Sequence, residues 1–472
     1  MKIIGPRTIP TLSGILLSFI AGMIVVHIGV FPYPQVRNAL KTLEAIVDHY
    51  ASRSKPYAGK WIGSADIPAS QASDRRWTVV DPSFDRLPVY VFGGMNHFRD
   101  LCPDLGCLAV EYGSDGAVTR TWPYRPAEIF AADMTAGEFP REYIGFDPVR
   151  NVHPMGIEAL GDGSLITTFQ SEGEGIFPFG MGVSRVSEDG APVWTRFDYT
   201  HHWPRLDSEG RPMVAGMAIG EGDIRLSIGE EPDEHRTTIR CGNGQHHVDL
   251  VNTLGPNGEI VESIDLLELF RSSNWAMLLR ETTNGCDPLH LNFIDEIGPD
   301  AGPGIAPGDL IVSFRNISRF AVLDRDTRTI KRVVAGGFVQ QHSVHHLAGT
   351  RFLVFDNHGG DEFGPPSRIL EIDIAAGTER RVFPIDTTPE PWRFVFTNKA
   401  GHIDISPDRR RVIASFTHEG LAFEVDIATG RLITVYDHLH DLTGIGGRPD
   451  PDADKATRFS LYGINYARPD RR

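Results

Sequence analysis

Histidines recur along this chain at the start of similar sequence blocks. Five such blocks begin at His153, His202, His290, His342 and His402. A neutral imidazole can bind a metal ion, attack as a nucleophile or transfer protons, and it can also simply bond to a neighbouring backbone group. A single buried histidine often has only this last, structural role. Several histidines that meet at one place favour a chemical role.

The blocks that follow these histidines consist of four short β-strands each. Two apolar runs flank a turn such as Gly161 to Gly163 or Ser406 to Asp408, and two more flank Arg325 to Arg328 or Ile427 to Gly430. Turn residues between β-rich runs of this length are typical of hairpins. Repeats of about 50 residues made of four strands predict an all-β, six-bladed β-propeller, with a first blade near residues 89–122.

The spacing of the blocks is uneven in one place. The steps from 153 to 202, from 290 to 342 and from 342 to 402 are 49, 52 and 60 residues, whereas the step from 202 to 290 is 88. The long step predicts an insertion or a poorly conforming blade. Because the first strand of each blade lines the central channel of a propeller, we expect the five histidines to converge at one mouth of that channel.

Charge and motif spacing disfavour two classes of site. The formal net charge is -16 and no long Lys/Arg-rich run occurs, which argues against a nucleic-acid partner. No Cys-x-x-Cys pair is present. The neighbouring histidines His201/His202, His246/His247 and His345/His346 are expected to point to opposite faces of their strands, so that they cannot readily chelate one ion. We therefore predict no metal site.

The N-terminal segment, residues 1–33, is predicted to be a signal anchor. Its 21 residues from Thr11 to Phe31 include no Asp, Glu, Lys or Arg and can cross a hydrocarbon core. Lys2 and Arg7 precede this run, which places the rest of the chain outside the cytoplasm. We expect a single-pass cell-membrane protein with its folded part on the periplasmic or extracellular side. A cleavable signal peptide is the alternative.

Between the anchor and the folded part, residues 34–76 are predicted to form a short amphipathic helix and a linker, and the propeller is expected to occupy residues 77–472. The cysteines agree with export. Cys102 and Cys107 could close a small disulfide loop, and Cys241 and Cys286 could form a second pair; four thiols are the alternative.

Several motifs resemble the arylsulfotransferase family, which consists of exported bacterial six-bladed propellers. They are DPLHLN (Asp287 to Asn292), VSFRN (Val312 to Asn316), QQHSV (Gln340 to Val344), and FDN (Phe355 to Asn357) followed by SRILEID (Ser367 to Asp373). The resemblance covers residues 280–430 well and the first half only by its repeat pattern. It implies transfer of a sulfuryl group from an aryl sulfate to a phenol through a sulfohistidine, without a metal or an organic cofactor.

The resemblance also implies roles for individual residues. His290 and His342 would hold sulfuryl oxygens or help with proton transfer, and Arg315 would stabilise negative charge. The nucleophile is expected to be His418, with His402 as the alternative, since His418 follows the inner strand of the last complete blade.

The sequence departs from the family pattern after Phe355 to Asn357, where the family has a second active-site arginine. Arg368 or His358 could take its place. This departure leaves two other functions open. One is an inactive propeller of the same family that binds a ligand or a protein outside the cytoplasm, and the other is a metal-dependent hydrolase or lyase. The oligomeric state and the natural donor and acceptor are not predicted.

Overall fold

The computed structural model describes residues 61–131, 135–136, 152–171, 180–227, 236–242, 244–358, 365–397, 399–445 and 454–468. The predicted signal anchor and the helix after it lie outside these residues. Within the described part of the chain, no helix has both the length and the apolar character that a membrane span requires.

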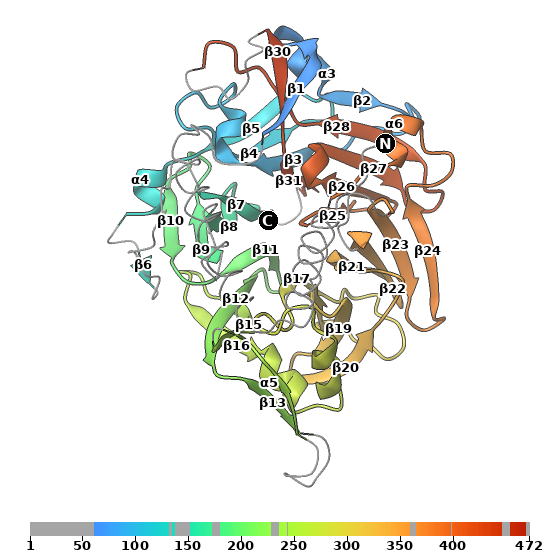
Figure 1. Cartoon of the computed structure of the whole chain (residues 1–472). Helices are drawn as coiled ribbons and strands as arrows, with labels where there is room; N and C mark the ends of the chain where they lie inside the picture. The colour runs from blue at the N-terminus through green and yellow to red at the C-terminus, as the bar shows by residue number, and fades with distance from the viewer. Residues whose placement is uncertain are drawn as a thin grey trace, which may run out of the picture. The chain divides into compact units, whose positions relative to one another are not determined.

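Six sheets carry most of the described chain (Figure 1), and they are antiparallel except for the parallel pairing of β6 with β10. The first contains β31 (Leu461–Tyr466), β3 (Val89–Gly93), β4 (Cys107–Tyr112) and β5 (Val118–Pro123); the second contains β7 (Val152–Ala159), β8 (Leu165–Ser171), β9 (Gly180–Val186), β10 (Pro192–Arg196) and β6 (Thr135–Ala136); the third contains β11 (His201–Leu206), β12 (Pro212–Glu221), β15 (Gln245–Leu254) and β16 (Ile260–Asp265). The fourth contains β17 (Leu291–Glu296), β18 (Leu310–Phe314), β19 (Arg319–Asp324) and β20 (Thr329–Val334); the fifth contains β21 (His342–Ala348), β22 (Arg351–Asp356), β23 (Arg368–Asp373) and β24 (Thr378–Phe383); the sixth contains β25 (His402–Ile405), β26 (Arg411–Phe416), β27 (Leu421–Asp426), β28 (Leu432–Asp437) and β2 (Trp77–Val79).

One strand of each sheet lies nearest the centre of Figure 1. We call these strands the first strands; they are β31, β7, β11, β17, β21 and β25. Contacts between first strands run from β7 through β11, β17, β21 and β25 to β31, and β31 contacts β7 in turn. The last strand of the chain, β31, pairs with β3 and therefore completes a sheet whose other strands come from the N-terminal part. Sheets that meet in this propeller-like way protect their edge strands.

The predicted turns are confirmed. Residues 161–163 connect β7 to β8, residues 325–328 connect β19 to β20, and residues 406–408 connect β25 to β26. In the first of these turns Gly163 has a φ of +86°, a conformation that favours glycine. These short connections set the register of each strand pair and so fix which side chains face the centre.

Apolar side chains fill the space between neighbouring sheets. Phe355 and Phe383 of the fifth sheet pack against Phe416 and Phe423 of the sixth, with ring centroids 5.1 Å apart for Phe355 and Phe416 and 5.0 Å apart for Phe383 and Phe423. All four rings are fully buried. Burial of a phenylalanine side chain stabilises a fold by about 1.5–3 kcal/mol, so this packing holds the first strands at fixed positions.

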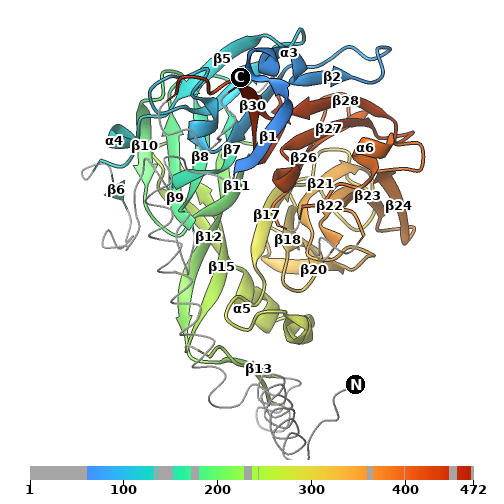
Figure 2. The same ribbon diagram turned by 45° about the horizontal axis from the view of Figure 1, so that its top comes forward.

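The long step between His202 and His290 contains an insertion, as predicted. The hairpin of β13 (Ile224–Ser227) and β14 (Arg236–Ile239) interrupts the third sheet, and α5 (Leu266–Arg271) and η3 (Ala276–Glu281) follow it. In Figure 2, β12 and β15 lead away from the sheets toward β13. Asp265 caps α5 by accepting a hydrogen bond from the N–H of Glu268.

The folded part begins earlier than residue 77. β1 (Trp61–Pro68) pairs with β30 (Lys455–Phe459), which also pairs with β29 (Leu439–His440). The segment predicted to be a linker therefore contains a strand, because its partner strand lies near the other end of the sequence. The remaining short helices are η1 (Ala69–Gln71), α3 (Ala72–Arg75), η2 (Met95–Phe98), α4 (Pro126–Ile129), α6 (Glu390–Arg393) and η5 (Thr417–Glu419).

Both predicted disulfides are present. Cys102 is bonded to Cys107, and Cys241 is bonded to Cys286. No cysteine of the chain is free.

Candidate functional site

Three of the five histidines that begin the sequence blocks, which we call the head histidines, lie close together. The ring centroid of His202 lies 5.3 Å from that of His290 and 6.3 Å from that of His342. These residues stand at the starts of β11, β17 and β21, three consecutive first strands. The charge of Arg315 acts on both His202 and His342. We call these four residues the head cluster.

Asp287 holds His290 by its Nδ1 atom, at a distance of 2.5 Å from Asp287 Oδ2. The other oxygen of the same carboxylate, Oδ1, lies 3.3 Å from Nδ1 of His247. Burial alone would raise the pKa of Asp287, but His290 and His247 lower it well below its usual value. An ionised carboxylate accepts only, so His290 presents Nδ1–H to Oδ2 of Asp287, and Nδ1 of His247 lies beside the other oxygen.

His342 is held in the same tautomer by an amide. Its Nδ1 lies 2.6 Å from Oδ1 of Asn357, while Nδ2 of Asn357 donates to the carbonyl oxygens of Thr397 and Ala400, at 2.8 Å each. Because the amide nitrogen of Asn357 is occupied as a donor, its oxygen must accept from His342. The lone pair of His342 therefore lies on Nε2.

Arg315 begins the turn after β18 and is half-buried. Its backbone N–H donates to the carbonyl of His290 at 3.1 Å, and its guanidinium donates to the side-chain oxygens of Asn316 and Gln340, at 3.1 Å each. Burial lowers the pKa of Arg315, and the nearby Asp287 opposes this effect. Arginine stays charged across the range of pH in which proteins fold, so the head cluster contains a fixed positive charge.

The backbone is unusual at the head cluster. His202 and His290 have φ values of +57° and +56°, and Gln340 and Ser343 on either side of His342 have values of +53° and +48°. Non-glycine residues rarely adopt this left-handed conformation, and such strain concentrates at functional sites.

The same conformation corrects one expectation from the sequence. We expected His201 and His202 to point to opposite faces, but their Nδ1 atoms lie 2.5 Å apart. The rule of alternating faces fails because His202 is not in an extended conformation. The other two pairs do diverge, since His246 contacts the carbonyl of Gly222 whereas His247 contacts Asp287.

The buried imidazoles of the head cluster are uncharged at neutral pH. Burial, together with Arg315 and His290, lowers the pKa of His342 to about 3. Burial and the neighbouring His201 lower the pKa of His202 well below its usual value. The side chain of His290 is 15% exposed, so it gives the cluster its contact with solvent. The cluster therefore combines the neutral imidazoles of His202 and His342 with one guanidinium.

His402 is not a member of the head cluster. Its ring stacks on Trp203 at 4.8 Å and lies 6.0 Å from the ring of His345. His345 belongs to a buried ionic layer in which Arg205 contacts Asp295 at 3.5 Å. His402 is two residues before the layer residue of its own strand, Asp404, whereas His342 is three before His345. The ring of His402 lies against the ionic layer, on the side of His345.

The ionic layer consists of one residue from each of five first strands. They are Glu158, Arg205, Asp295, His345 and Asp404. Such a fully paired, buried group is expected to fix the arrangement of the strands.

His418 and Arg368 are not members of the head cluster. Nδ1 of His418 lies 2.8 Å from Oγ1 of Thr397, whose carbonyl in turn accepts from Asn357. His418 is thus linked to His342 through two intervening residues. Arg368 donates from Nε to Asp356 at 2.8 Å and from Nη2 to the carbonyl of Gly337 at 2.7 Å, so its guanidinium is engaged within its own sheet and the adjoining loop. The fifth head histidine, His153, stacks on Tyr462.

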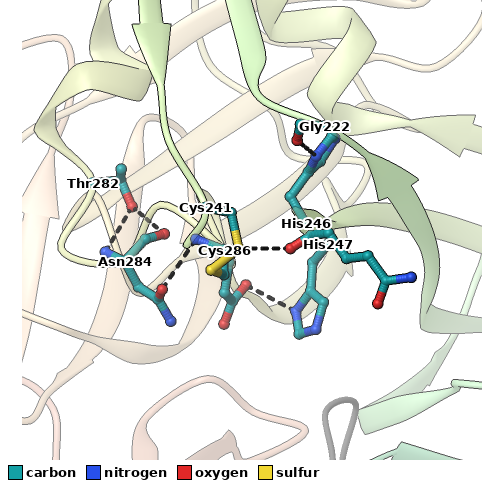
Figure 3. The surroundings of a disulfide bond; sticks show 9 residues. Gly222, Cys241, His246, His247, Thr282, Asn284 and Cys286 are labelled. Carbon is teal, nitrogen blue, oxygen red and sulfur yellow. Dashed lines mark hydrogen bonds and ion pairs between the residues drawn. A yellow bond between two sulfur atoms is a disulfide. The ribbon is translucent and has the colours of Figure 1, made fainter. Parts of the chain in front are cut away.

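The disulfide between Cys241 and Cys286 supports one side of the head cluster (Figure 3). Cys286 immediately precedes Asp287, and its carbonyl accepts a hydrogen bond of 2.8 Å from the N–H of His247. Asn284 also accepts from the N–H of Cys286, at 3.1 Å. The loop that carries Asp287 is therefore tied to the strand that carries His247.

A second group of buried histidines joins the two ends of the described chain. Nδ1 of His97 lies 3.3 Å from Nε2 of His438, and Nδ1 of His438 lies 3.3 Å from Nε2 of His440 and 3.1 Å from the hydroxyl of Tyr436. Nδ1 of His440 contacts Asp100 at 2.9 Å. We call His97, Asp100, His438 and His440 the seam cluster, because it joins η2 to the strands β28 and β29.

Arg76 completes the seam. Its guanidinium lies 3.4 Å from Asp100 and donates to the carbonyl of Leu439 at 2.8 Å. Burial lowers the pKa of His438 and of His440, whereas Asp100 has a lowered pKa because His440 and Arg76 outweigh its burial. Among the residues that the structure describes, neither this cluster nor any other group of histidines, cysteines and carboxylates is arranged to hold a metal ion.

Comparisons with known proteins identify no family. No family model and no curated protein sequence matches the chain. Similar solved structures include a protein of unknown function from Bacteroides caccae, which is 10% identical with a TM-score of 0.43 and covers 81% of this chain and 99% of that chain. Others are a putative 6-phosphogluconolactonase from Bacteroides fragilis (10% identity, TM-score 0.39, 82% and 99% covered) and the β-propeller domain of Swd1 from Myceliophteria thermophila (13% identity, TM-score 0.33, 70% and 79% covered). Likenesses this weak carry no argument about the site.

Sequence reasoning missed part of the site. Asp287 and Asn357 occur in the quoted motifs, but neither was given a role, although Asp287 stands three residues before His290 as a partner would. His201 and His247 were set aside as members of neighbouring pairs. No local signal marks His247 as a partner of Asp287, because the two are 40 residues apart in the sequence.

Proposed function

We propose that this protein transfers a sulfuryl group from an aryl sulfate to a phenol, with His342 as the nucleophile. The observation that carries the proposal is the tautomer of His342, because Asn357 holds its Nδ1–H and leaves the lone pair on Nε2. A neutral, oriented imidazole beside the positive charge of Arg315 is what attack on an anionic ester requires. The resemblance to the arylsulfotransferase family supplies the substrate class.

The reaction has two steps. In the first, Nε2 of His342 attacks sulfur, the N–S bond forms, the S–O bond to the aryl group breaks, and the phenolate leaves with the electron pair. Arg315 stabilises the charge on the sulfuryl oxygens. In the second, the acceptor phenol attacks the sulfur and the N–S bond breaks. Nε2 of His290 takes the phenol proton, and Asp287 stabilises the resulting imidazolium. Neither step requires a metal or a cofactor.

This assignment differs from the expectation that His418 is the nucleophile. His418 contacts Thr397, and Thr397 contacts Asn357, so the hydrogen bonds of the described residues connect His418 to His342 through these two residues. We assign to His418 a supporting role in holding Asn357. His402, stacked on Trp203 beside the ionic layer, is assigned a structural role.

We further propose that the six sheets are the blades of one closed six-bladed β-propeller, completed by β31. The circuit of contacts between first strands supports this. The two disulfides support an oxidising compartment and therefore a folded part outside the cytoplasm. We propose the membrane anchor from the apolar run Thr11 to Phe31.

The test uses the full-length protein with 4-nitrophenyl sulfate and a phenol acceptor, without added metal, and follows release of nitrophenolate. We expect release that depends on the acceptor. A reaction quenched before the acceptor is added should contain a sulfuryl adduct, which fragmentation of the peptide places on His342. His346→Asn is the control on the same strand, because His346 lies outside the head cluster and contacts the carbonyl of Gly349, the ring of Phe352 and the carboxylate of Asp300.

The outcomes separate the alternatives. An adduct on His418 would assign the nucleophile as the sequence alone indicated. Absence of release with every phenol tried, from protein that is folded, would contradict transfer and favour a binding function for the head cluster.

A further inference from the structure

Asp249 holds the backbone at the start of β17. It lies on β15 in the third sheet and is 1% exposed. Its Oδ1 accepts a hydrogen bond of 3.1 Å from the N–H of Leu291, and the N–H of His290 also bonds to this carboxyl group. Two successive N–H groups directed at one side chain fix the left-handed conformation of His290. The orientation of the His290 ring therefore depends on a residue from the neighbouring sheet.

Asp249 differs from Asp287, which acts on the same histidine. Oδ2 of Asp287 is hydrogen-bonded to Nδ1 of His290, and its Oδ1, which completes no hydrogen bond among the described residues, lies 3.3 Å from Nδ1 of His247. Oδ2 of Asp249 is also buried without a hydrogen-bond partner among the residues that the structure describes, and Asp249 has no such histidine ion pair there. Burial of an oxygen atom without a hydrogen-bond partner costs much more free energy in an ionised carboxylate than in a neutral carboxylic acid.

The charge of Asp287 also raises the pKa of Asp249, whereas His290 and the two backbone N–H groups lower it by less than burial and Asp287 raise it. The titratable groups that surround Asp249 are Asp287 and His290, with His247 and His201 behind them. Burial and the negative charge of Asp287 raise the pKa of Asp249 to about 7. Two carboxyl groups at one buried place do not readily ionise together, and Asp287 has the two histidine partners that favour its ionised form.

We propose that Asp249 is a positioning residue for His290 and that it acts as an uncharged carboxylic acid. This inference rests on the proposed function only in its effect on turnover. As a neutral acid, Asp249 orients His290 without adding a second negative charge beside Asp287. The proton that His290 accepts from the phenol is then stabilised by one carboxylate of fixed position.

The first test does not depend on activity. Infrared difference spectra between the wild-type protein and Asp249→Asn at neutral pH should contain the carbonyl stretch of one protonated carboxylic acid. Asp207→Asn is the matched control, because Asp207 is also buried but accepts from Arg211 and Arg325 and has a lowered pKa. Its spectrum should contain no such band. Absence of the band for Asp249→Asn overturns the proposal.

The second test is the pH dependence of stability. The folded protein keeps the proton of Asp249 up to about pH 7, whereas the unfolded chain loses it near 3.8. Stability from this group therefore falls as pH rises from 3.8 to about 7 and is constant above that. Asp249→Asn lacks this loss, so its melting temperature should rise relative to the wild type across the same window. A constant difference between the two proteins overturns the assignment of a neutral acid.

The third test measures turnover. Asp249→Ala should lower kcat about 10-fold to 100-fold with little change in KM, because His290 is misplaced while Arg315 and His342 still bind the donor. Asp249→Asn, which keeps an oxygen acceptor, should restore most of kcat. Equal kcat in wild type and Asp249→Ala overturns the positioning role. A wild type without any activity contradicts the proposed function alone, since the infrared and stability tests still decide the state of Asp249.

Discussion

The chain gathers buried histidines in two places, and the two groups use their ring nitrogens differently. In the head cluster, Asp287 and Asn357 each hold Nδ1 of one imidazole, and for His342 this leaves the lone pair on Nε2. In the seam cluster, His438 is engaged at both nitrogens, by His97 on one side and His440 on the other. An imidazole held by one nitrogen can react through the other. An imidazole held by both serves as a cross-link.

The cations of the two regions differ in the same way. At the seam, Arg76 is buried and engaged with Asp100 and the carbonyl of Leu439. Arg315 in the head cluster is half-buried and, among the residues that the structure describes, its guanidinium donates to the neutral side-chain oxygens of Asn316 and Gln340. A guanidinium without a carboxylate partner in direct contact can still bind an anionic ester. Histidines of both clusters are buried, so the groups that contact them, more than burial, distinguish the head cluster, for which we propose a reaction, from the seam cluster.

The largest expected effect is the loss of activity in His342→Asn. Removal of a covalent nucleophile should lower nitrophenolate release roughly 10³-fold or more, because no other group forms the intermediate. His438→Asn at the seam should retain most activity and lose stability instead. Steady-state rates and thermal melts of both variants make the comparison. If the two variants lost equal activity, the proposed division between the regions would be wrong.

The second prediction compares two aspartates that hold histidines. Asp287→Asn should lower kcat about 10²-fold to 10⁴-fold, since an amide in this place no longer fixes the tautomer of His290 or stabilises its charged form. Asp100→Asn should leave kcat nearly unchanged and lower the free energy of unfolding by about 3 kcal/mol, because a buried ion pair loses one partner. Kinetics and chemical denaturation measure the two effects. A loss of kcat in Asp100→Asn comparable to that in Asp287→Asn would connect the seam to the reaction.

Local sequence features were sufficient for much of the fold. The turns at residues 161–163 and 406–408 could be predicted because turn residues and flanking β-rich runs act over a few positions. The convergence of His290 and His342 follows from the repeat alone. In contrast, the pairing of β31 with β3 joins strands more than 300 residues apart, and nothing within β31 specifies that partner.

The site was less predictable for two physical reasons. A left-handed backbone at His202 overrides the alternation of strand faces, and this conformation depends on contacts made by distant residues such as Met155. His342 joins the head cluster whereas His402 packs against the ionic layer, and the number of residues to the layer does not decide this, since His290 stands five residues before Asp295 and still joins the cluster. Neither the left-handed backbone of His202 nor the position of His402 can be predicted from residue spacing alone.

The third prediction concerns the two arginines. Arg315→Gln should lower kcat/KM about 10-fold to 100-fold, because the charge that faces the sulfuryl oxygens is lost while the hydrogen-bonding shape is partly retained. Arg368→Gln should change kcat/KM little, since Arg368 contacts Asp356 and the Gly337 carbonyl. The rates of both variants decide whether Arg368 substitutes for the arginine that the family has after Asn357. A loss in Arg368→Gln equal to that in Arg315→Gln would show that it does.

The smallest expected effect is on the pH dependence of stability, and here the two clusters should behave alike. His342 and His438 both have folded-state pKa values below 6.5, the first at about 3, because burial disfavours the charged imidazole. The unfolded chain takes up a proton at each as pH falls below 6.5, and the folded protein does not. Their contribution is therefore fully present above 6.5 and is lost as pH falls toward the folded values.

His342→Asn and His438→Asn should each make stability less sensitive to pH below 6.5, as measured by melting temperature in a pH series. The two clusters should differ, however, in their effect on the first step of the reaction. The burst of nitrophenolate without acceptor needs only an uncharged His342, so its acid limb belongs near pH 3 in the wild type and in His438→Asn alike. An acid limb near 6.5 in the burst would mean that the attacking imidazole is ordinary and solvated, and His342 would be excluded as the nucleophile.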